Sequence, residues 1–368
     1  MNPIDDLISI SRYYGGDNRF VIAGGGNTSY KNNDYIWVKA SGSSLATIGE
    51  EGFAKLDRSL LNRMTDKEYS KDVTKREQEV KNDLTEATLT KERRPSVETS
   101  MHNVIGYAFV VHLHPTFVNG LMCASESEKE LYRLFGEKAL YVEYTDPGYL
   151  LFKKVASKID EYRTQYGEEP QVIWLQNHGI FVAADSTEEI KKIYADILNK
   201  IQENLDKPIP EGEMSIPSNV VEIIPALRMI LSRNGLKTLR LRNNALIHSF
   251  GEHLLKQQEI ALPFTPDAIV YCKSNYLFLN EETTGSLLPE AEKAIASFEQ
   301  MHGYLPKIIL IKGIGLVAVG DNADQCDIIL DVFEDAMKVA TISHAFGGPH
   351  HMTAEQIDFI DHWEVENY

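Results

Sequence analysis

The first half of the chain alternates short runs rich in β-branched and aromatic residues with longer stretches of helical periodicity. Strands are predicted at residues 20–23 and 35–38, on either side of a glycine-rich turn, and a helix at residues 53–64. The densely charged segment 67–94 is only weakly periodic, which is typical of a solvated helix or a mobile excursion. Such alternation of strands and helices is typical of an α/β domain.

The same alternation continues toward the middle of the chain. A strand is predicted at residues 108–114, and Pro115 stops it. A further apolar strand is predicted at residues 171–176, between helices at about residues 149–166 and 187–205.

A change in composition then divides the chain. Residues 206–218 read DKPIPEGEMSIPS, and a stretch so rich in proline, glycine and acids is typical of a linker. We therefore expect one domain over residues 1–205 and a second over residues 219–368.

The second half repeats a pattern from the first. Residues 172–185, VIWLQNHGIFVAAD, match residues 308–321, IILIKGIGLVAVGD, at an offset of 136 positions (308 minus 172). His178 of the first copy corresponds to Ile314 of the second, so the second copy has no side chain at this turn that could bind a metal. The second domain is therefore expected to act as scaffold, interface or specificity wall.

Composition narrows the class of protein. With 368 residues, the chain can form two domains that each bury a core. A net charge of −17, without a compensating basic stripe, argues against nucleic acid and membranes as partners. Three cysteines at scattered spacings are typical of buried thiols in a reducing compartment, and the acidic N-terminus is unlike a signal peptide. We expect a cytoplasmic protein.

Two histidines stand close together in the strand predicted at residues 108–114. His112 and His114 are two positions apart, and alternate residues of a strand project from the same face. This spacing suits two ligands of one metal ion, although an isolated pair of this kind is more often structural.

A third histidine and an acid complete a candidate metal centre. His178 follows an apolar strand, and Gly179 allows the backbone to turn tightly there. Three histidines leave coordination positions open for a substrate, as in catalytic zinc sites. Glu98 could ligate the resting metal and act as base, or it could be a first-turn acid that stabilises a helix N-terminus.

The glycine-rich turn is a candidate anion site. Gly24–Gly26 can present several backbone N–H groups, and Asn27, Thr28 and Ser29 add neutral donors. Lys31 and Lys39 are near enough in sequence to help, although three glycines alone are more often only a flexible turn.

Five segments occur in a fixed order: GGGNTS, ASGSS, PSVE, HLHP and QNHG. Together they resemble the class II aldolase and adducin family, over roughly residues 4–205. The resemblance implies an α/β/α domain around a mainly antiparallel sheet, followed by a degenerate repeat of the same fold. The second half, with FTPD at 264–267, KGIG at 312–315 and DHWE at 361–364, is similar to the aldolase half of bifunctional rhamnulose-1-phosphate aldolase and lactaldehyde dehydrogenase proteins.

The resemblance also implies roles for single residues. His112, His114 and His178 would bind zinc or another divalent metal, and Glu98 would be the acid/base residue. The phosphate of a substrate would be held by Asn27, Ser41, Gly42 and Ser96, beside Gly26 and Thr28 of the glycine-rich turn. In some members, a tyrosine of a neighbouring subunit protonates the leaving aldehyde, and Tyr132 is the candidate here.

The function so implied is that of a zinc-dependent class II aldolase. It would cleave a phosphorylated deoxyketose, such as rhamnulose 1-phosphate, to dihydroxyacetone phosphate and an aldehyde. The same enediolate chemistry serves a sugar-phosphate epimerase or dehydratase, so the motif residues leave these alternatives open. A non-catalytic adducin-like interaction module is a further alternative, which the retained histidines disfavour. We expect a homo-oligomer, with a separate dehydrogenase polypeptide as a candidate partner.

Overall fold

The computed structural model describes residues 2–280 and 287–363, so Glu364 of the DHWE motif lies outside the described residues. The chain forms two compact units. One holds the described residues up to Met122 together with Glu126–Asn204, and the other holds Cys123–Ser125 and the described residues from Leu205 onward.

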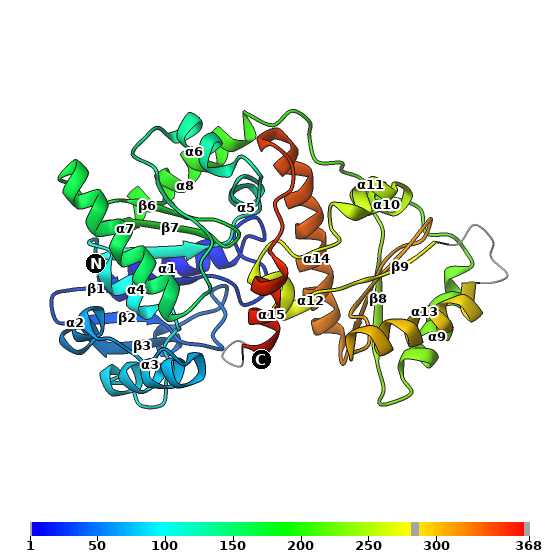
Figure 1. Cartoon of the computed structure of the whole chain (residues 1–368), viewed down its shortest axis with the longest axis horizontal. Helices are drawn as coiled ribbons and strands as arrows, with labels where there is room; N and C mark the ends of the chain where they lie inside the picture. Colours follow the sequence, from blue (N-terminus) through cyan, green and yellow to red (C-terminus); the bar gives the residue numbers. More distant parts are fainter. Residues whose placement is uncertain (1, 281–286, 364–368) are drawn as a thin grey trace. The chain divides into compact units, whose positions relative to one another are not determined.

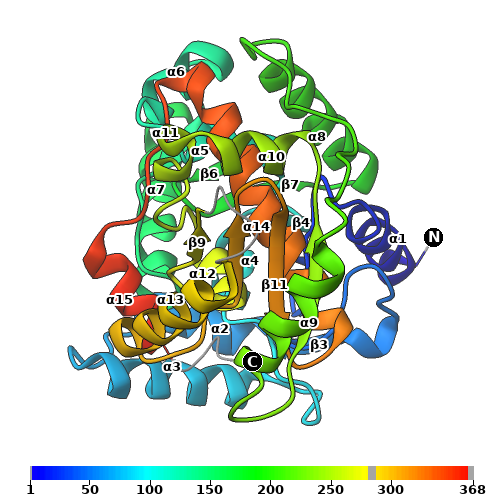
Figure 2. The ribbon, with the colours of Figure 1, turned by 90° about the vertical axis from the view of Figure 1, so that its right-hand side faces the viewer.

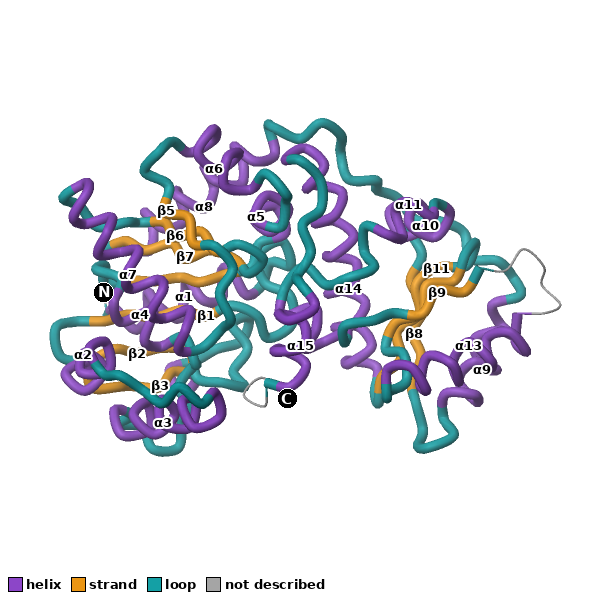
Figure 3. Tube along the Cα trace, viewed as in Figure 1, coloured by secondary structure: helices purple, strands orange, loops and turns teal. Residues whose placement is uncertain are grey.

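The first unit is built on a seven-stranded sheet with the order β3-β2-β1-β4-β7-β6-β5 (Figures 1 and 3). Its strands are β1 (Asn27–Lys31), β2 (Tyr35–Lys39), β3 (Phe53–Asp57), β4 (Phe109–Leu113), β5 (Leu140–Val142), β6 (Val172–Leu175) and β7 (Gly179–Ala184). All neighbouring strands in this sheet are antiparallel except β5 and β6. The mainly antiparallel sheet predicted for this fold class is confirmed.

Helices cover both faces of this sheet. They are α1 (Pro3–Gly15), α2 (Arg58–Asp66), α3 (Val73–Ala87), α4 (Thr99–Val104), α5 (Thr116–Met122), α6 (Ser127–Phe135), α7 (Tyr149–Tyr166) and α8 (Thr187–Gln202). In Figure 1, α4 and α7 lie on one face, and α1 and α8 lie on the other. Because β4 lies between these layers, all five of its residues are buried, as expected for a strand covered on both faces.

The second unit is built on a four-stranded sheet with the order β8-β11-β10-β9. Its strands are β8 (Thr238–Arg242), β9 (Leu277–Leu279), β10 (Ile308–Ile311) and β11 (Gly315–Gly320). Its helices are α9 (Val220–Leu231), α10 (Ala245–Glu252), α11 (Leu254–Gln258), α12 (Pro266–Cys272), α13 (Leu287–His302), α14 (Ala323–Ser343) and α15 (Ala354–His362). Figure 2 shows α9 and α13 on one face of this sheet and α14 on the other.

The two sheets share one arrangement of four strands. The sequence β8-β11-β10-β9 reproduces β4-β7-β6-β5, including the antiparallel and parallel pairings. The helix caps also recur, since Ser186 caps α8 as Asn322 caps α14, at the same offset of 136 positions. The second unit therefore repeats half of the first sheet and, among its described residues, has no counterpart of β1, β2 and β3.

The strand registers show what the repeat has lost. His112 pairs with Phe181 in the first unit, and Leu241 pairs with Val317, the residue 136 positions after Phe181, in the second. Leu241 therefore occupies the position of His112. By the same register, Asn243 corresponds to His114, and Ile314 corresponds to His178. All three candidate ligands are replaced.

Several predicted elements differ from the structure. Residues 20–23 form a turn rather than a strand, because Phe20 packs against the rings of Tyr14 and Tyr194. Residues 53–64 are not one helix: β3 ends at Asp57, whose carboxylate accepts from the Ser59 amide and begins α2. The charged segment 67–94 contains the ordered helix α3. No helix within the described residues is long and apolar enough to cross a bilayer.

The repeat allows a prediction about the turn between β10 and β11. Gly313 has φ of 69°, and the equivalent Asn177 has φ of 53°, so both occupy the left-handed region. A Cβ at Gly313 would meet no atom within 4 Å, so backbone strain alone should decide the cost of substitution. Gly313→Asn should lower the free energy of unfolding by about 1 kcal/mol less than Gly313→Val, because asparagine tolerates this region. Denaturant titration of both variants measures this difference, and equal midpoints would contradict it.

Candidate functional site

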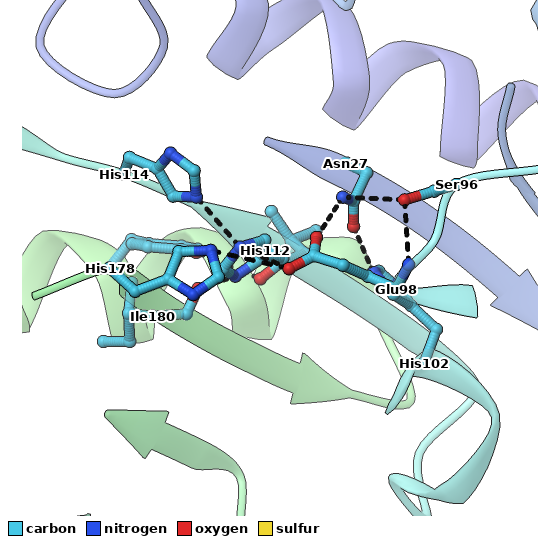
Figure 4. A network of polar contacts seen from close by, with 10 residues as sticks. Asn27, Ser96, Glu98, His102, His112, His114, His178 and Ile180 are labelled. Carbon is cyan, nitrogen blue, oxygen red and sulfur yellow. Dashed lines mark hydrogen bonds and ion pairs between the residues drawn. The ribbon is translucent and has the colours of Figure 1, made fainter. Parts of the chain in front are cut away.

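Three imidazole rings meet where β4 ends and β7 begins, in the middle of the first sheet (Figure 4). His112 lies in β4, His114 lies just beyond the end of β4, and His178 lies in the turn between β6 and β7. One ring nitrogen of each lies within 4.8 Å of the others. The structure therefore brings together the three histidines that the sequence singled out.

Close approach of two strands fixes this geometry. Gly179 begins β7 directly opposite the end of β4, and a Cβ on it would lie 2.5 Å from His114 Cδ2 and 2.6 Å from the Leu113 carbonyl oxygen. Asn177, just before His178, takes the left-handed conformation that reverses the chain. The turn thus presents His178 beside the two histidines of the β4 segment.

A hydrogen bond from Nδ1 orients the ring of His112. Its Nδ1–H donates to the carbonyl oxygen of Ile180 at 3.1 Å, and its ring stacks on Phe181 at a centroid distance of 4.1 Å. Nε2 therefore faces the cluster, 2.9 Å from Nε2 of His114. Metal-ligating histidines commonly donate their other ring N–H to a backbone carbonyl in this way.

The carboxylate of Glu98 lies against two of these rings. Its Oε1 is 3.4 Å from His112 Nε2 and 3.5 Å from His178 Nε2. Its Oε2 accepts a hydrogen bond of 2.5 Å from the side-chain amide of Asn27. Glu98 is only 8% exposed, so these groups rather than water satisfy it.

Asn27 reaches Glu98 because of its place in the sheet. It begins β1 and pairs directly with His112 across the β1–β4 ladder. Asn27, Ser29 and Lys31 alternate along β1 and therefore face the same way, toward α4. Each of them makes a polar contact with the α4 segment: Asn27 with Glu98, Ser29 with His102, and the Lys31 amino group with the His102 carbonyl oxygen.

His102 is a residue that the sequence reasoning missed. It is fully buried, its Nδ1 lies 2.7 Å from Ser29 Oγ, and its Nε2 makes a hydrogen bond with Asn27 Oδ1. Burial, with smaller effects of His112 and Lys31, lowers the pKa of His102 well below its usual range. The spacing of four residues between Glu98 and His102, one helical turn, was the available signal.

Ser96, a candidate phosphate ligand, contacts Asn27, and two further candidates lie on the segment next to Ser96. Asn27 Nδ2 also donates to Ser96 Oγ at 3.4 Å. The segments that carry Ser41 and Ser96 run side by side, through a bridge between Ala40 and Pro95 and a bond from the Ser41 amide to the Arg94 carbonyl. Figure 4 shows Ser96 on the side of Asn27 away from His112, His114 and His178, and the Ser41 hydroxyl donates to the Pro95 carbonyl oxygen at 3.4 Å.

Three other candidates lie elsewhere. The Thr28 hydroxyl is buried on the opposite face of β1, 2.7 Å from Ser11 Oγ, because neighbouring strand residues alternate. Lys31 is committed to the His102 carbonyl, and burial lowers the pKa of Lys31 well below its usual range. Tyr132 lies on α6, 37% exposed, and donates to Glu128 rather than joining the cluster. Lys39 lies beside the glycine-rich turn, with its amino group 3.3 Å from the Gly24 carbonyl oxygen.

The residues present fit a divalent cation. Imidazole nitrogens and a carboxylate oxygen are ligands that zinc accepts, and three protein ligands are typical of catalytic zinc sites. Two Nε2 atoms that face each other at 2.9 Å need a proton or a cation between their lone pairs. Among the described residues, this group of histidines is the cluster with suitable ligand spacing.

Two family models match this chain. Residues 5–197 match the model of the class II aldolase and adducin N-terminal domain, and residues 298–368 match that of the aldolase class II second domain. A Bacillus subtilis (strain 168) protein named uncharacterized oxidoreductase YuxG is 22% identical to this chain over an alignment of 410 positions, gaps included. The alignment covers 99% of this chain and 58% of that protein. The chain thus spans a little over half the length of this relative.

Two solved structures are similar to part of this chain. The N-terminal class II aldolase domain of a conserved Thermoplasma acidophilum protein is 25% identical, covers 54% of this chain and 92% of its own, and has a TM-score of 0.47. An L-fuculose-1-phosphate aldolase from Thermus thermophilus is 16% identical, covers 54% of this chain and 92% of its own, and has a TM-score of 0.34.

The close strand approach at Gly179 gives a prediction about the site. Gly179→Ala should lower the free energy of unfolding by about 1–3 kcal/mol, because the added methyl group must displace His114 or the β4 backbone. Zinc affinity, measured by competition with a chromophoric chelator, should fall with it. Gly251→Ala is the control, since its Cβ would meet nothing closer than 4.0 Å. Equal behaviour of the two variants would show that the approach does not hold the site.

Proposed function

The chain belongs to the class II aldolase and adducin family, and we propose that it is a zinc-dependent aldolase acting on a phosphorylated ketose such as rhamnulose 1-phosphate. The products would be dihydroxyacetone phosphate and an aldehyde. The observation that carries the proposal is the cluster of His112, His114 and His178, with the Glu98 carboxylate against two of its rings.

The proposed chemistry divides between the histidines and Glu98. A divalent cation held by the three histidines would supply Lewis-acid stabilisation of the negative charge that develops on the substrate oxygens. When the carbon–carbon bond breaks, the carbon that stays with the phosphate half must gain a proton. The hydroxyl of the departing half loses a proton as it becomes the aldehyde, so the protons balance. Glu98 would hold a proton on Oε1, the oxygen that faces His112 and His178, and deliver it to that carbon.

The phosphate would lie on the other side of Asn27. Ser41 and Ser96 offer hydroxyl donors there, beside Asn27, whose own amide hydrogens are taken by Glu98 and Ser96. The backbone of Gly26 and Gly42 adds amide groups. Lys39 would contribute the positive charge, since its amino group already lies by the glycine-rich turn. Such a site would hold an anion although the chain as a whole is strongly acidic.

Two further proposals concern what completes the site. Tyr132 of a neighbouring copy of the chain would exchange a proton with the aldehyde oxygen: in cleavage it takes the hydroxyl proton that the leaving aldehyde loses, and in the reverse addition it returns that proton. A neighbouring copy is invoked because Tyr132 lies on α6 of its own chain, where it donates to Glu128. The second unit, without the three ligands, would serve as scaffold or interface. A homo-oligomer, a cytoplasmic location and a separate dehydrogenase partner stay predictions. The epimerase, dehydratase and adducin-like alternatives gain no support from the comparisons.

The proposal is tested by substrate cleavage. Purified protein with zinc is offered a panel of ketose 1-phosphates, and release of dihydroxyacetone phosphate is followed through NADH oxidation by glycerol-3-phosphate dehydrogenase. Glu98→Gln should lower kcat about 10²- to 10⁴-fold, because a general acid or base usually contributes a rate acceleration of this size. Glu161→Gln, at a glutamate whose side chain is 63% exposed, should leave kcat unchanged. Wild-type protein that cleaves none of the panel, or a fully active Glu98→Gln variant, would refute the proposal.

A further inference from the structure

A chain of hydrogen bonds runs away from the candidate site into the core of the first unit. It connects Glu98, Asn27, His102 and Ser29 in that order (Figure 4 draws the first three). We propose that His102 is a positioning residue that sets the amide orientation of Asn27 and thereby fixes the carboxylate of Glu98. The inference rests on the role given to Glu98 in the proposed function.

The direction of the chain follows from Glu98. An ionised carboxylate only accepts hydrogen bonds, so the Asn27 atom that lies 2.5 Å from Oε2 must be the amide nitrogen. Asn27 Oδ1 then faces Nε2 of His102, and Oδ1 only accepts. Nε2 of His102 must therefore carry the ring proton.

Without that proton, Nε2 of His102 would present a lone pair to Asn27 Oδ1, and the repulsion between these two acceptors would oppose the orientation that Glu98 favours. A half-turn about the last side-chain bond exchanges its oxygen and nitrogen at almost no steric cost. The reversed amide would place Oδ1 against Glu98 Oε2, two acceptors at hydrogen-bond distance. The carboxylate would then rotate or take up a proton.

His102 is itself held too tightly to follow such a change. Its ring is fully buried, Ser29 Oγ lies 2.7 Å from Nδ1, and Phe181 packs edge-on at 5.4 Å between ring centroids. The Lys31 amino group binds its carbonyl oxygen at 2.8 Å, which anchors the backbone as well. Water has no access to replace the ring nitrogen as a donor to Asn27.

The consequence lies at the other oxygen of Glu98. With Oε2 held by Asn27, Oε1 is directed at Nε2 of both His112 and His178. A carboxylate held at one oxygen keeps the other in place for a cation or for a substrate proton. His102 therefore acts on the site through Asn27, without touching substrate or metal.

Two substitutions separate this role from simple packing. The amide nitrogen of glutamine can reach the position of histidine Nε2, so His102→Gln keeps a donor for Asn27. The amide of asparagine reaches only the position of Nδ1, so His102→Asn keeps a partner for Ser29 and leaves Asn27 Oδ1 without a donor. Both variants replace the ring by a smaller amide, which makes them a matched pair.

The first test measures zinc affinity, by competition with a chromophoric chelator, and steady-state kinetics for both variants. His102→Asn should weaken zinc binding, or lower kcat with little change in KM, by about 10- to 100-fold, as expected for a group that orients a ligand. His102→Gln should stay within about threefold of wild type, since it restores the hydrogen bond. Equal loss in both variants would reduce His102 to a packing role and overturn the proposal.

The second test needs no variant to fold and no activity. Histidine ring nitrogens of the uniformly ¹⁵N-labelled wild-type protein report by NMR which nitrogen carries the proton. His102 should show the Nε2–H form, whereas His112, which donates from Nδ1 to Ile180, should show the Nδ1–H form in the metal-bound protein. An Nδ1–H form of His102 would overturn the proposal. A chain that cleaves no sugar phosphate would refute the proposed function but leave this result and the zinc affinities to decide the role of His102.

Discussion

The buried carboxylate of Glu98 is the group on which the arrangement of the site depends. A carboxylate with so little exposure must be satisfied by donors or positive charge inside the protein. One oxygen is satisfied by Asn27, and the other lies against two imidazoles. These partners come from β1, β4 and the β6–β7 turn, so the pairing of β1 with β4 and of β4 with β7 is what makes the site possible.

The second unit shows the same scaffold without this constraint. It keeps the four-strand order, the turn in the left-handed conformation and the helix cap of the first unit. It lacks a described counterpart of β1, the strand that supplies Asn27, and it carries Leu241, Asn243 and Ile314 in place of the three histidines. Ligands and supporting strand are therefore absent together, which is consistent with a repeat that serves structure rather than chemistry.

Local patterns in the sequence predicted the parts of the site that depend on local geometry. The alternation of His112 and His114 in a strand, and the hairpin that presents His178, follow from strand periodicity and turn residues alone. The strand predicted at residues 20–23 was wrong because aromatic packing against Tyr14 and Tyr194 outweighs the β propensity of Phe20 and its neighbours. The spacing of one helical turn between Glu98 and His102 was a signal, but it did not reveal the role of His102, which depends on β1 and α4 meeting across a large separation in sequence. Thr28 was expected beside Asn27 as a phosphate ligand, but neighbouring residues of a strand face opposite sides, so its hydroxyl lies against Ser11 instead.

The central claim is that the chain binds one divalent cation through the histidines of the first unit. Elemental analysis of purified protein after incubation with zinc tests it most directly, with His178→Ala as the variant and His362→Ala, at a histidine whose side chain is 78% exposed, as the control. The account predicts about one zinc per chain in wild type and control, because three ligands define one site, and loss of the zinc in His178→Ala. Wild-type protein without metal, or a His178→Ala variant that retains it, would contradict the account.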